Sequence, residues 1–161
     1  DRSMDPGRRL QQRRTSDLEI KNSFEEYRDK VLDAASDRPG KYMIRCLMTN
    51  GRIQNIKWSK FLRLAEKFRE TKEKYGLRDG DRVYLLTPYT ADALLSFAVL
   101  SVNHLTVVFG DPGIPKEELI YQTGCTEVSA VFADRKLIPA LDGVTDVPVF
   151  STFGLRSDMD L

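Results

Sequence analysis

The sequence predicts an α/β protein, in which an N-terminal helix and a β-hairpin precede a parallel sheet with flanking helices. Two observations carry this prediction. The dipeptide Asn50-Gly51 separates two stretches of strand-like composition, which is typical of a hairpin. After Gly76 the pattern changes to short apolar runs that alternate with helical segments. Such strand-helix-strand units build parallel sheets through right-handed crossovers.

The composition fits one compact domain. The 161 residues hold 25 Lys and Arg against 24 Asp and Glu, a formal net charge of +1, which excludes binding to nucleic acid through bulk charge. No apolar run approaches the roughly 20 residues that span a bilayer, and the charged residues 1–14 do not resemble a signal peptide. Cys46 and Cys125 lack the spacing of disulfide frameworks or zinc sites, so we expect a cytoplasmic protein.

The N-terminal residues divide into a tail and a helix. Residues 1–16 contain five arginines and little to bury, so we expect a disordered tail, with the α/β subdomain spanning 17–161. A basic arm that binds phosphate or membrane is the alternative, but the charge is low for that role. Ser23 and Glu26 have the spacing of a capping box, and the helix that they begin is expected to stop at residues 37–40.

The hairpin is predicted over Lys41–Thr49 and Arg52–Trp58, with Asn50-Gly51 as a two-residue turn in which both residues take positive φ. Ser59 can then cap an amphipathic helix that ends at Gly76. Its apolar stripe consists of Phe61, Leu64, Ala65, Phe68 and Tyr75. Its charged residues are expected to face water, and they are Lys60, Arg63, Glu66, Lys67, Arg69, Glu70, Lys72 and Glu73.

Four apolar runs predict the strands of the parallel sheet, because they are β-branched or aromatic with little polar alternation. They lie near residues 82–87, 105–109, 128–133 and 147–151. Helices are expected between them at 90–102, 115–123 and, in short form, 136–141. The first of these is apolar all round and therefore buried, and Gly124 marks the end of the second.

The residue types that carry chemistry are mostly missing. Neither common glycine-rich phosphate loop occurs, and Gly110–Gly113 is interpreted as a strand-to-helix turn. The single histidine, His104, has no G-x-S-x-G serine to activate, and it shares no metal-ligand spacing with Cys46 or Cys125. Two pairs of acidic residues have structural explanations. Asp79 and Asp81 lie in a predicted turn, and Glu117 and Glu118 lie at the start of a predicted helix. No catalytic, cofactor-binding or metal-binding residue is assigned.

Parallel sheets bind ligands at the carboxyl ends of their strands. In this sequence those ends fall at Thr87–Thr90, Gly110–Pro112, Asp134-Arg135 and Ser151-Thr152. Tyr89 and Thr90, which stand at the start of a predicted helix, are the residues there that we expect to contact a ligand.

An ordered series of motifs between Lys57 and about Arg135 resembles the opening of the AMP-forming adenylation superfamily, which contains acyl-CoA synthetases, peptide-synthetase adenylation domains and beetle luciferases. The series covers about half of the chain. It consists of Trp58-Ser59 and the helix FLRLAEKFRE, the run Gly76-Leu77-Arg78-Asp79-Gly80-Asp81-Arg82-Val83, Pro88 with ADALLSFAVLSV, Phe109-Gly110-Asp111-Pro112, the helix from Pro115 to Tyr121, and the strand from Glu127 to Phe132. Asn103-His104 departs from the small residues that the family has there.

The resemblance implies a function for a longer parent protein. Such an enzyme activates a carboxylic acid as an acyl-adenylate with ATP and Mg²⁺, and then transfers it to CoA or to the phosphopantetheine thiol of a carrier. The family's phosphate loop, ribose-binding aspartate and C-terminal lysine come later than Leu161. We therefore expect an N-terminal fragment of the large domain that is inactive alone and whose partner is the rest of the parent.

A complete, non-catalytic α/β module that binds a ligand or a partner is the alternative, and composition suits both. A fragment is also expected to expose apolar surface on its sheet and on the helix ALLSFAVLSV, through which a homodimer can form.

Overall fold

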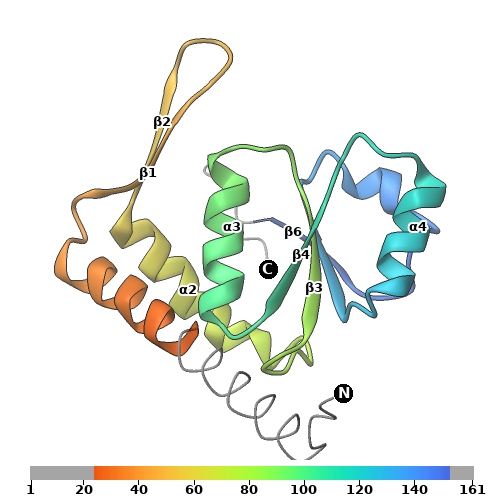
Figure 1. Cartoon of the computed structure of the whole chain (residues 1–161), viewed down its shortest axis with the longest axis horizontal. Coiled ribbons are helices and arrows are strands. Elements are labelled where there is room, and N and C mark those ends of the chain that lie inside the picture. The colour runs from red at the N-terminus through yellow and green to blue at the C-terminus, as the bar shows by residue number, and fades with distance from the viewer. Residues whose placement is uncertain (1–23, 153–161) are drawn as a thin grey trace, which may run out of the picture.

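The chain is described by a computed structural model over residues 24–152, and it has the predicted α/β architecture (Figure 1). A two-stranded antiparallel hairpin stands beside a four-stranded sheet with the order β4-β3-β5-β6. The predicted tail at residues 1–16 lies outside the described residues. The elements that build the sheet and its cover are β3 (Arg82–Leu86), α3 (Ala91–Val102), β4 (Thr106–Gly110), α4 (Lys116–Cys125), β5 (Ala130–Ala133), the 3₁₀ turn Ile138–Leu141 and β6 (Val149–Ser151).

The N-terminal helix and the hairpin are confirmed, but the predicted turn is wrong. Residues 24–37 are helical, and β1 (Tyr42–Leu47) pairs antiparallel with β2 (Ile53–Lys57). The amide of Met48 donates to Arg52 O (2.8 Å) and that of Gly51 to Met48 O (2.9 Å). Of the two central residues only Gly51 has positive φ, at 76°. The loop is therefore a three-residue connection in which glycine alone takes the left-handed conformation.

Helix α2 (Trp58–Lys72) begins two residues earlier than a cap at Ser59 implies. Its N-cap is Lys57, which makes no side-chain cap hydrogen bond, so the prediction that Ser59 caps the helix is wrong. The predicted apolar stripe faces the core, with Phe61 and Phe68 fully buried. The helix also buries Lys72, which is 7% exposed and not solvated as predicted. The helix ends at Lys72 with Glu73 as its C-cap, so the predicted end at Gly76 is wrong; Gly76, with φ of 72°, lies in the turn that follows.

The parallel sheet is confirmed at every pairing. β3 lies between β4 and β5, and β6 continues beyond β5, all in parallel register. The chain connects these strands through α3 and α4, which cover opposite faces of the sheet (Figure 1). Alternate residues of β3 therefore enter two different cores: Val83 and Leu85 face α2 and α3, whereas Tyr84 and Leu86 face the side of α4.

The end of α3 agrees with the sequence prediction, whereas the end of α4 differs from it. α3 spans the apolar run as predicted, and its C-cap is Asn103. α4, in contrast, continues past Gly124 to Cys125, and the residue that ends it in a left-handed conformation is Glu127, with φ of 51°. Gly124 is thus an interior helix residue, and no property of its own ends the helix.

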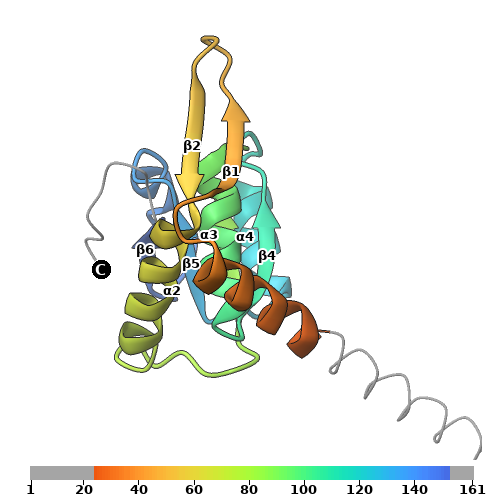
Figure 2. The same cartoon turned by 90° about the vertical axis from the view of Figure 1, so that its left-hand side faces the viewer.

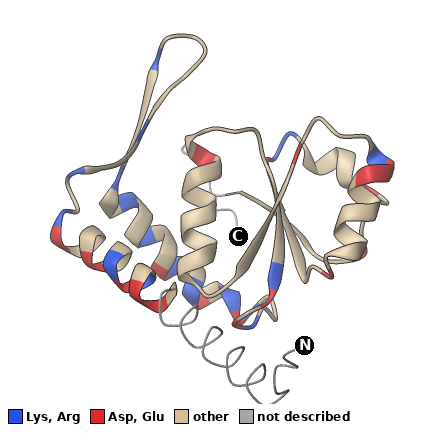
Figure 3. Cartoon of the chain, in the orientation of Figure 1, with Lys and Arg blue, Asp and Glu red and all other residues tan. Residues whose placement is uncertain are grey.

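The hairpin projects from the body of the protein (Figure 2). Its cross-strand pair Leu47 and Ile53 is 73% and 54% exposed, whereas Ile56 at its base is fully buried. Charged residues are frequent in residues 24–37 and in α2, and the strands of the parallel sheet contain few (Figure 3). Among the described residues, none of the helices has the length and apolar character needed to cross a bilayer.

Candidate functional site

The carboxyl edge of the parallel sheet is where the sequence places a ligand site. The structure brings the strand ends together there: the amide of Asp134 donates to Leu86 O and that of Thr152 to Ala133 O, both at 2.9 Å. Tyr89 is 81% exposed in the segment between β3 and α3, and Thr90 is the N-cap of α3. Tyr89 is thus accessible at this edge, and its contact with a ligand stays a prediction.

The turn after β4 is a poor phosphate site. Asp111 Oδ1 accepts a hydrogen bond from the amide of Gly113 (2.8 Å), so the turn is closed by its own carboxylate. That negative charge opposes an incoming phosphate, and Pro112 has no amide to donate. This turn therefore does not fit a phosphate group, and the interpretation of Gly110–Gly113 as a strand-to-helix turn is confirmed.

The packing of the sheet explains why position 110 is a glycine. A Cβ built at this position would overlap the ring of Tyr84, which is fully buried on the neighbouring strand. The Tyr84 hydroxyl donates to Gln122 Oε1 (2.7 Å), which ties β3 to α4. Burial raises the pKa of Tyr84 above its ordinary value, and the negative charges of Asp111 and Glu118 raise it further. A tyrosine held neutral in this way packs the sheet against α4, and it does not act as a base at neutral pH.

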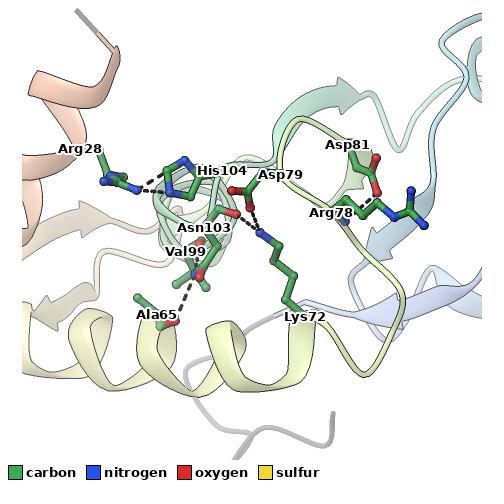
Figure 4. Close-up of polar contacts among 9 residues, drawn as sticks. All are labelled: Arg28, Ala65, Lys72, Arg78, Asp79, Asp81, Val99, Asn103 and His104. Carbon is green, nitrogen blue, oxygen red and sulfur yellow. Dashed lines mark hydrogen bonds and ion pairs between the residues drawn. The ribbon is translucent and has the colours of Figure 1, made fainter. Parts of the chain in front are cut away.

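The most connected polar cluster lies at the opposite edge, before the amino ends of β3 and β4 (Figure 4). Lys72 Nζ, at the end of α2, donates to the backbone oxygen of Asn103 (2.8 Å) and contacts the carboxylate of Asp79. Asn103 Nδ2 donates in turn to Val99 O (2.8 Å) and to Ala65 O (3.1 Å). One buried lysine and one buried asparagine therefore join α2, α3 and the loop before β3.

His104 completes this cluster on the side of the first helix. It has φ of 62°, the left-handed conformation that ends α3, and Arg28 Nη1 contacts its imidazole. The structural interpretation of His104 as a histidine at an element boundary is thus supported by its position and its partner.

The hydrogen bond from Lys72 lowers the pKa of Asp79 below its ordinary value. Desolvation opposes this shift, and the nearby charges of Lys72, His104 and Arg28 add to it. The side chain of Asp79 is 71% exposed, whereas that of Lys72 is 9% exposed. The cluster is therefore an ion pair with one buried and one solvated member, which is typical of a structural contact and lacks the raised pKa of a general acid.

The glycine and aspartate residues between Gly76 and Arg82 build the loop that holds Asp79. Gly80 has φ of 86°, and its amide donates to His104 O (2.7 Å). Asp81 Oδ2 accepts from the amide of Arg78 (2.8 Å), while Asp81 O accepts from that of Thr106 (2.9 Å). This run therefore sets the start of β3 against the start of β4, which is a structural role.

The other candidate residues remain apart. No group of His, Cys, Asp and Glu among residues 24–152 could hold a metal ion. Cys46 and Cys125 are free, on the hairpin and at the end of α4. Glu117 and Glu118 lie in the first turn of α4, as expected from the macrodipole. Sequence reasoning placed Lys72 among the solvated charges and noted Asn103 only as a departure from the family pattern, so it did not predict their contact. The only sequence signal for either residue is that it is polar and follows a buried apolar helix residue by four positions, and that pattern is common at helix ends.

Two cavities open beneath the first helix. One, of about 290 Å³, is lined by Tyr27, Val31, Trp58 and side chains of α3. The other, of about 710 Å³, is lined by apolar residues from the first helix, α3 and β4, with Glu25, Asp79 and His104 at its polar side. Its apolar members are Phe24, Phe97, Leu105 and Val107.

Comparison with solved structures places this architecture among larger proteins. The chain is similar to VinN, with 20% sequence identity and a TM-score of 0.63 over 77% of this chain and 31% of that one. It is similar to a structure reported in a study of fatty acyl-adenylate ligases from E. coli and L. pneumophila, with 17% identity and a TM-score of 0.62 over 77% of this chain and 23% of that one.

A third similar structure is the nonribosomal peptide synthetase FmoA3 with bound α-methyl-L-serine-AMP, with 14% identity and a TM-score of 0.66 over 77% of this chain and 14% of that one. No protein-family model and no curated protein sequence matches the chain. The chain spans about a third or less of these solved structures. The similarities show a shared fold, and they confirm the fold that the sequence resemblance to adenylate-forming enzymes implies.

Proposed function

We propose that the chain is the N-terminal portion of an ATP-dependent, AMP-forming ligase. The parent enzyme activates a carboxylic acid as an acyl-adenylate and transfers the acyl group to the thiol of CoA or of a carrier phosphopantetheine. The observation that carries this proposal is the fold shared with a fatty acyl-adenylate ligase and with a peptide synthetase that holds an aminoacyl-AMP analogue. The motif series from Trp58 to Phe132 supports the same assignment.

The chain contributes scaffold to this activity. Its described residues offer no phosphate cradle and no metal-binding group, so neither ATP nor Mg²⁺ is assigned to any of them. Stabilising the charge that develops at the α-phosphate requires preorganised donors, which belong to the remainder of the parent. We therefore expect the chain alone to be inactive and its natural partner to be that remainder. The free thiols Cys46 and Cys125 agree with a reducing, cytoplasmic setting.

ATP–pyrophosphate exchange tests the proposal. The 161-residue chain is expected to show no exchange above background with a panel of fatty, aromatic and amino acids. The chain extended with its native downstream sequence, which we expect to contain a Gly/Thr-rich loop ending in Pro-Lys-Gly, is expected to exchange with at least one acid. Exchange by the short chain, or a stop codon directly after Leu161, contradicts the proposal.

A non-catalytic module that binds a ligand at the carboxyl edge is the second candidate, and the exposed Tyr89 favours it. In that case a small-molecule screen by NMR shifts the amide signals around Tyr89 and Thr90, and Tyr89→Ala abolishes the shifts. Tyr121→Ala is the matched control, because Tyr121 is also an exposed tyrosine, at 66%, but lies on α4.

A further inference from the structure

We propose that two copies of the chain associate by antiparallel pairing of their β4 strands, with Phe109 of each copy entering the groove beside Val107 of the other. This inference does not depend on the proposed enzymatic function. It rests on the free backbone edge of β4, on the alternation of its side chains, and on the cavity of about 710 Å³ beside it.

The β4 edge is unprotected. β4 is the outermost strand of the sheet in the described residues, paired with β3 on one side alone. Soluble proteins protect such edges with charges, prolines or very short strands. The stretch Leu105–Gly110 contains neither a charge nor a proline. The opposite edge differs, because β6 has three residues and follows Pro148.

The backbone of β4 specifies a strand as its partner. The amide of Thr106 donates inward to Asp81 O (2.9 Å), so the next residue along the strand directs its N–H and C=O away from β3. By the same alternation, Val107 and Phe109 present their backbone groups at the open edge. These unpaired donors and acceptors are satisfied best by another extended chain.

One register uses the whole strand. If two copies of Thr106–Gly110 are centred on Val108, then Val107 of one copy lies opposite Phe109 of the other, and Thr106 lies opposite Gly110. The Val107–Phe109 pairs are the ones whose backbone groups face the partner, so each pair exchanges both of its hydrogen bonds. The twofold axis passes between the two Val108 residues, and the two sheets become one continuous sheet.

The side chains are complementary in this register. Val107 packs with the core beneath α3, and the Phe109 ring lies 5.3 Å from that of Phe97 on α3, so both project to the α3 face of the sheet. Phe109 is 54% exposed, and Val107, Phe97 and Phe24 line the large groove on the same face. Directly opposite residues on one face lie in contact, which brings the exposed Phe109 ring to the partner's groove.

The charges at the strand ends also agree. Asp111 follows β4 and is exposed, and in the centred register it lies opposite Leu105 of the other copy. The next residue there is His104, which Arg28 contacts. Asp79 of the same groove is paired with Lys72, and Arg28 Nη2 lies 3.5 Å from the Asp29 carboxylate of its own copy, so the incoming carboxylate competes with Asp29 for the Arg28 guanidinium.

Disulfide trapping tests both the association and its register, in a Cys125→Ser background. In Val108→Cys the two introduced thiols face each other across a pair whose Cα atoms lie about 4.5 Å apart, a spacing that a disulfide accepts. In the matched variant Thr106→Cys the two equivalent Cα atoms lie roughly 13 Å apart, since each faces Gly110 instead. Mild oxidation is expected to link Val108→Cys into a covalent dimer at least tenfold faster than Thr106→Cys. Equal rates, or no dimer from either, overturn the proposal.

Sedimentation velocity provides the second measurement. The unmodified chain is expected to shift from monomer to dimer across a hundredfold concentration range. Phe109→Lys places a charge at the centre of the interface and is expected to remain monomeric, whereas Tyr121→Lys, an equivalent change on α4, is expected to dimerise like the parent. A monomer throughout, or a dimer that survives Phe109→Lys, contradicts the proposal. If Phe109→Lys fails to fold, the trapping rates of the two cysteine variants decide alone.

Discussion

The ammonium of Lys72 lies 2.8 Å from the backbone oxygen of Asn103, in a position where the lysine is only 7% exposed. Helix α3 ends at this oxygen, and the negative end of its macrodipole therefore receives a positive charge from a different helix. The contact fixes the end of α3 relative to α2 through one side chain.

Replacing Lys72 by methionine is expected to lower the free energy of unfolding by about 1–3 kcal/mol, because the Asn103 oxygen and the Asp79 carboxylate both lose their donor. Urea denaturation followed by circular dichroism measures the change. Lys74→Met, at an exposed position two residues further along, is the control and is expected to change stability by less than about 0.5 kcal/mol. Equal effects of the two substitutions would show that the buried contact contributes nothing.

The stability that Asp79 provides should depend on pH in the acid range. Its pKa is lowered in the folded state, so its contribution is present above the unfolded value of about 3.9 and is lost as the pH falls through the lower folded value. Asp79→Asn is therefore expected to be less stable than the parent at pH 6, and the difference is expected to vanish at pH values below the folded pKa. Since the side chain is 71% exposed, added salt should reduce the difference at pH 6 as well. A constant difference at all pH values would contradict this assignment.

Gly110→Ala is expected to destabilise the protein by about 1–3 kcal/mol, because the added methyl group overlaps the buried ring of Tyr84. Gly124→Ala is the matched control in α4, where an added Cβ has no neighbour within 4 Å. This second substitution is expected to raise stability by about 0.5–1 kcal/mol, since alanine is the better helix former. If the structure is right, Gly110→Ala lowers the midpoint of thermal unfolding and Gly124→Ala raises it.

Gly80→Ala is expected to cost about 1–2 kcal/mol, because the residue has φ of 86° and its amide is held by the oxygen of His104. Gly40→Ala provides the comparison, since Gly40 lacks positive φ and a Cβ there has open space. Its stability is expected to stay equal or rise slightly. Denaturant midpoints at one pH measure both, and a neutral Gly80→Ala would disprove the strained conformation.

Much of the fold could be predicted from local pattern. Asn50-Gly51 marked the hairpin, and the largely apolar run of α3 marked a buried helix, because each signal depends on neighbouring residues alone. The two-residue turn was wrong because Gly51 by itself supplies the left-handed residue that the loop needs. The environment of Lys72 could not be predicted, because its partners Asp79 and Asn103 are brought to it by tertiary packing.

The candidate site was predictable only in position. The carboxyl edge and the exposed Tyr89 follow from the parallel topology, which the alternation of strands and helices indicates. The polar cluster of Lys72, Asp79, Asn103, His104 and Arg28 did not follow from it, because its members are spread from the first helix to the end of α3. The strand order, on which the open edge at β4 depends, is likewise set by long-range pairing that no local pattern encodes.

The order β4-β3-β5-β6 also determines how the sheet can assemble as the chain leaves the ribosome. β3 and β4 pair first, β5 then adds to the free side of β3, and β6 adds to β5. Each new strand joins an edge that already exists, so no strand has to insert between two paired neighbours, and growth proceeds in one direction. Nascent chains on adjacent ribosomes therefore present the β4 edge while β5 and β6 are still being added, which makes this edge an early point at which two chains can meet.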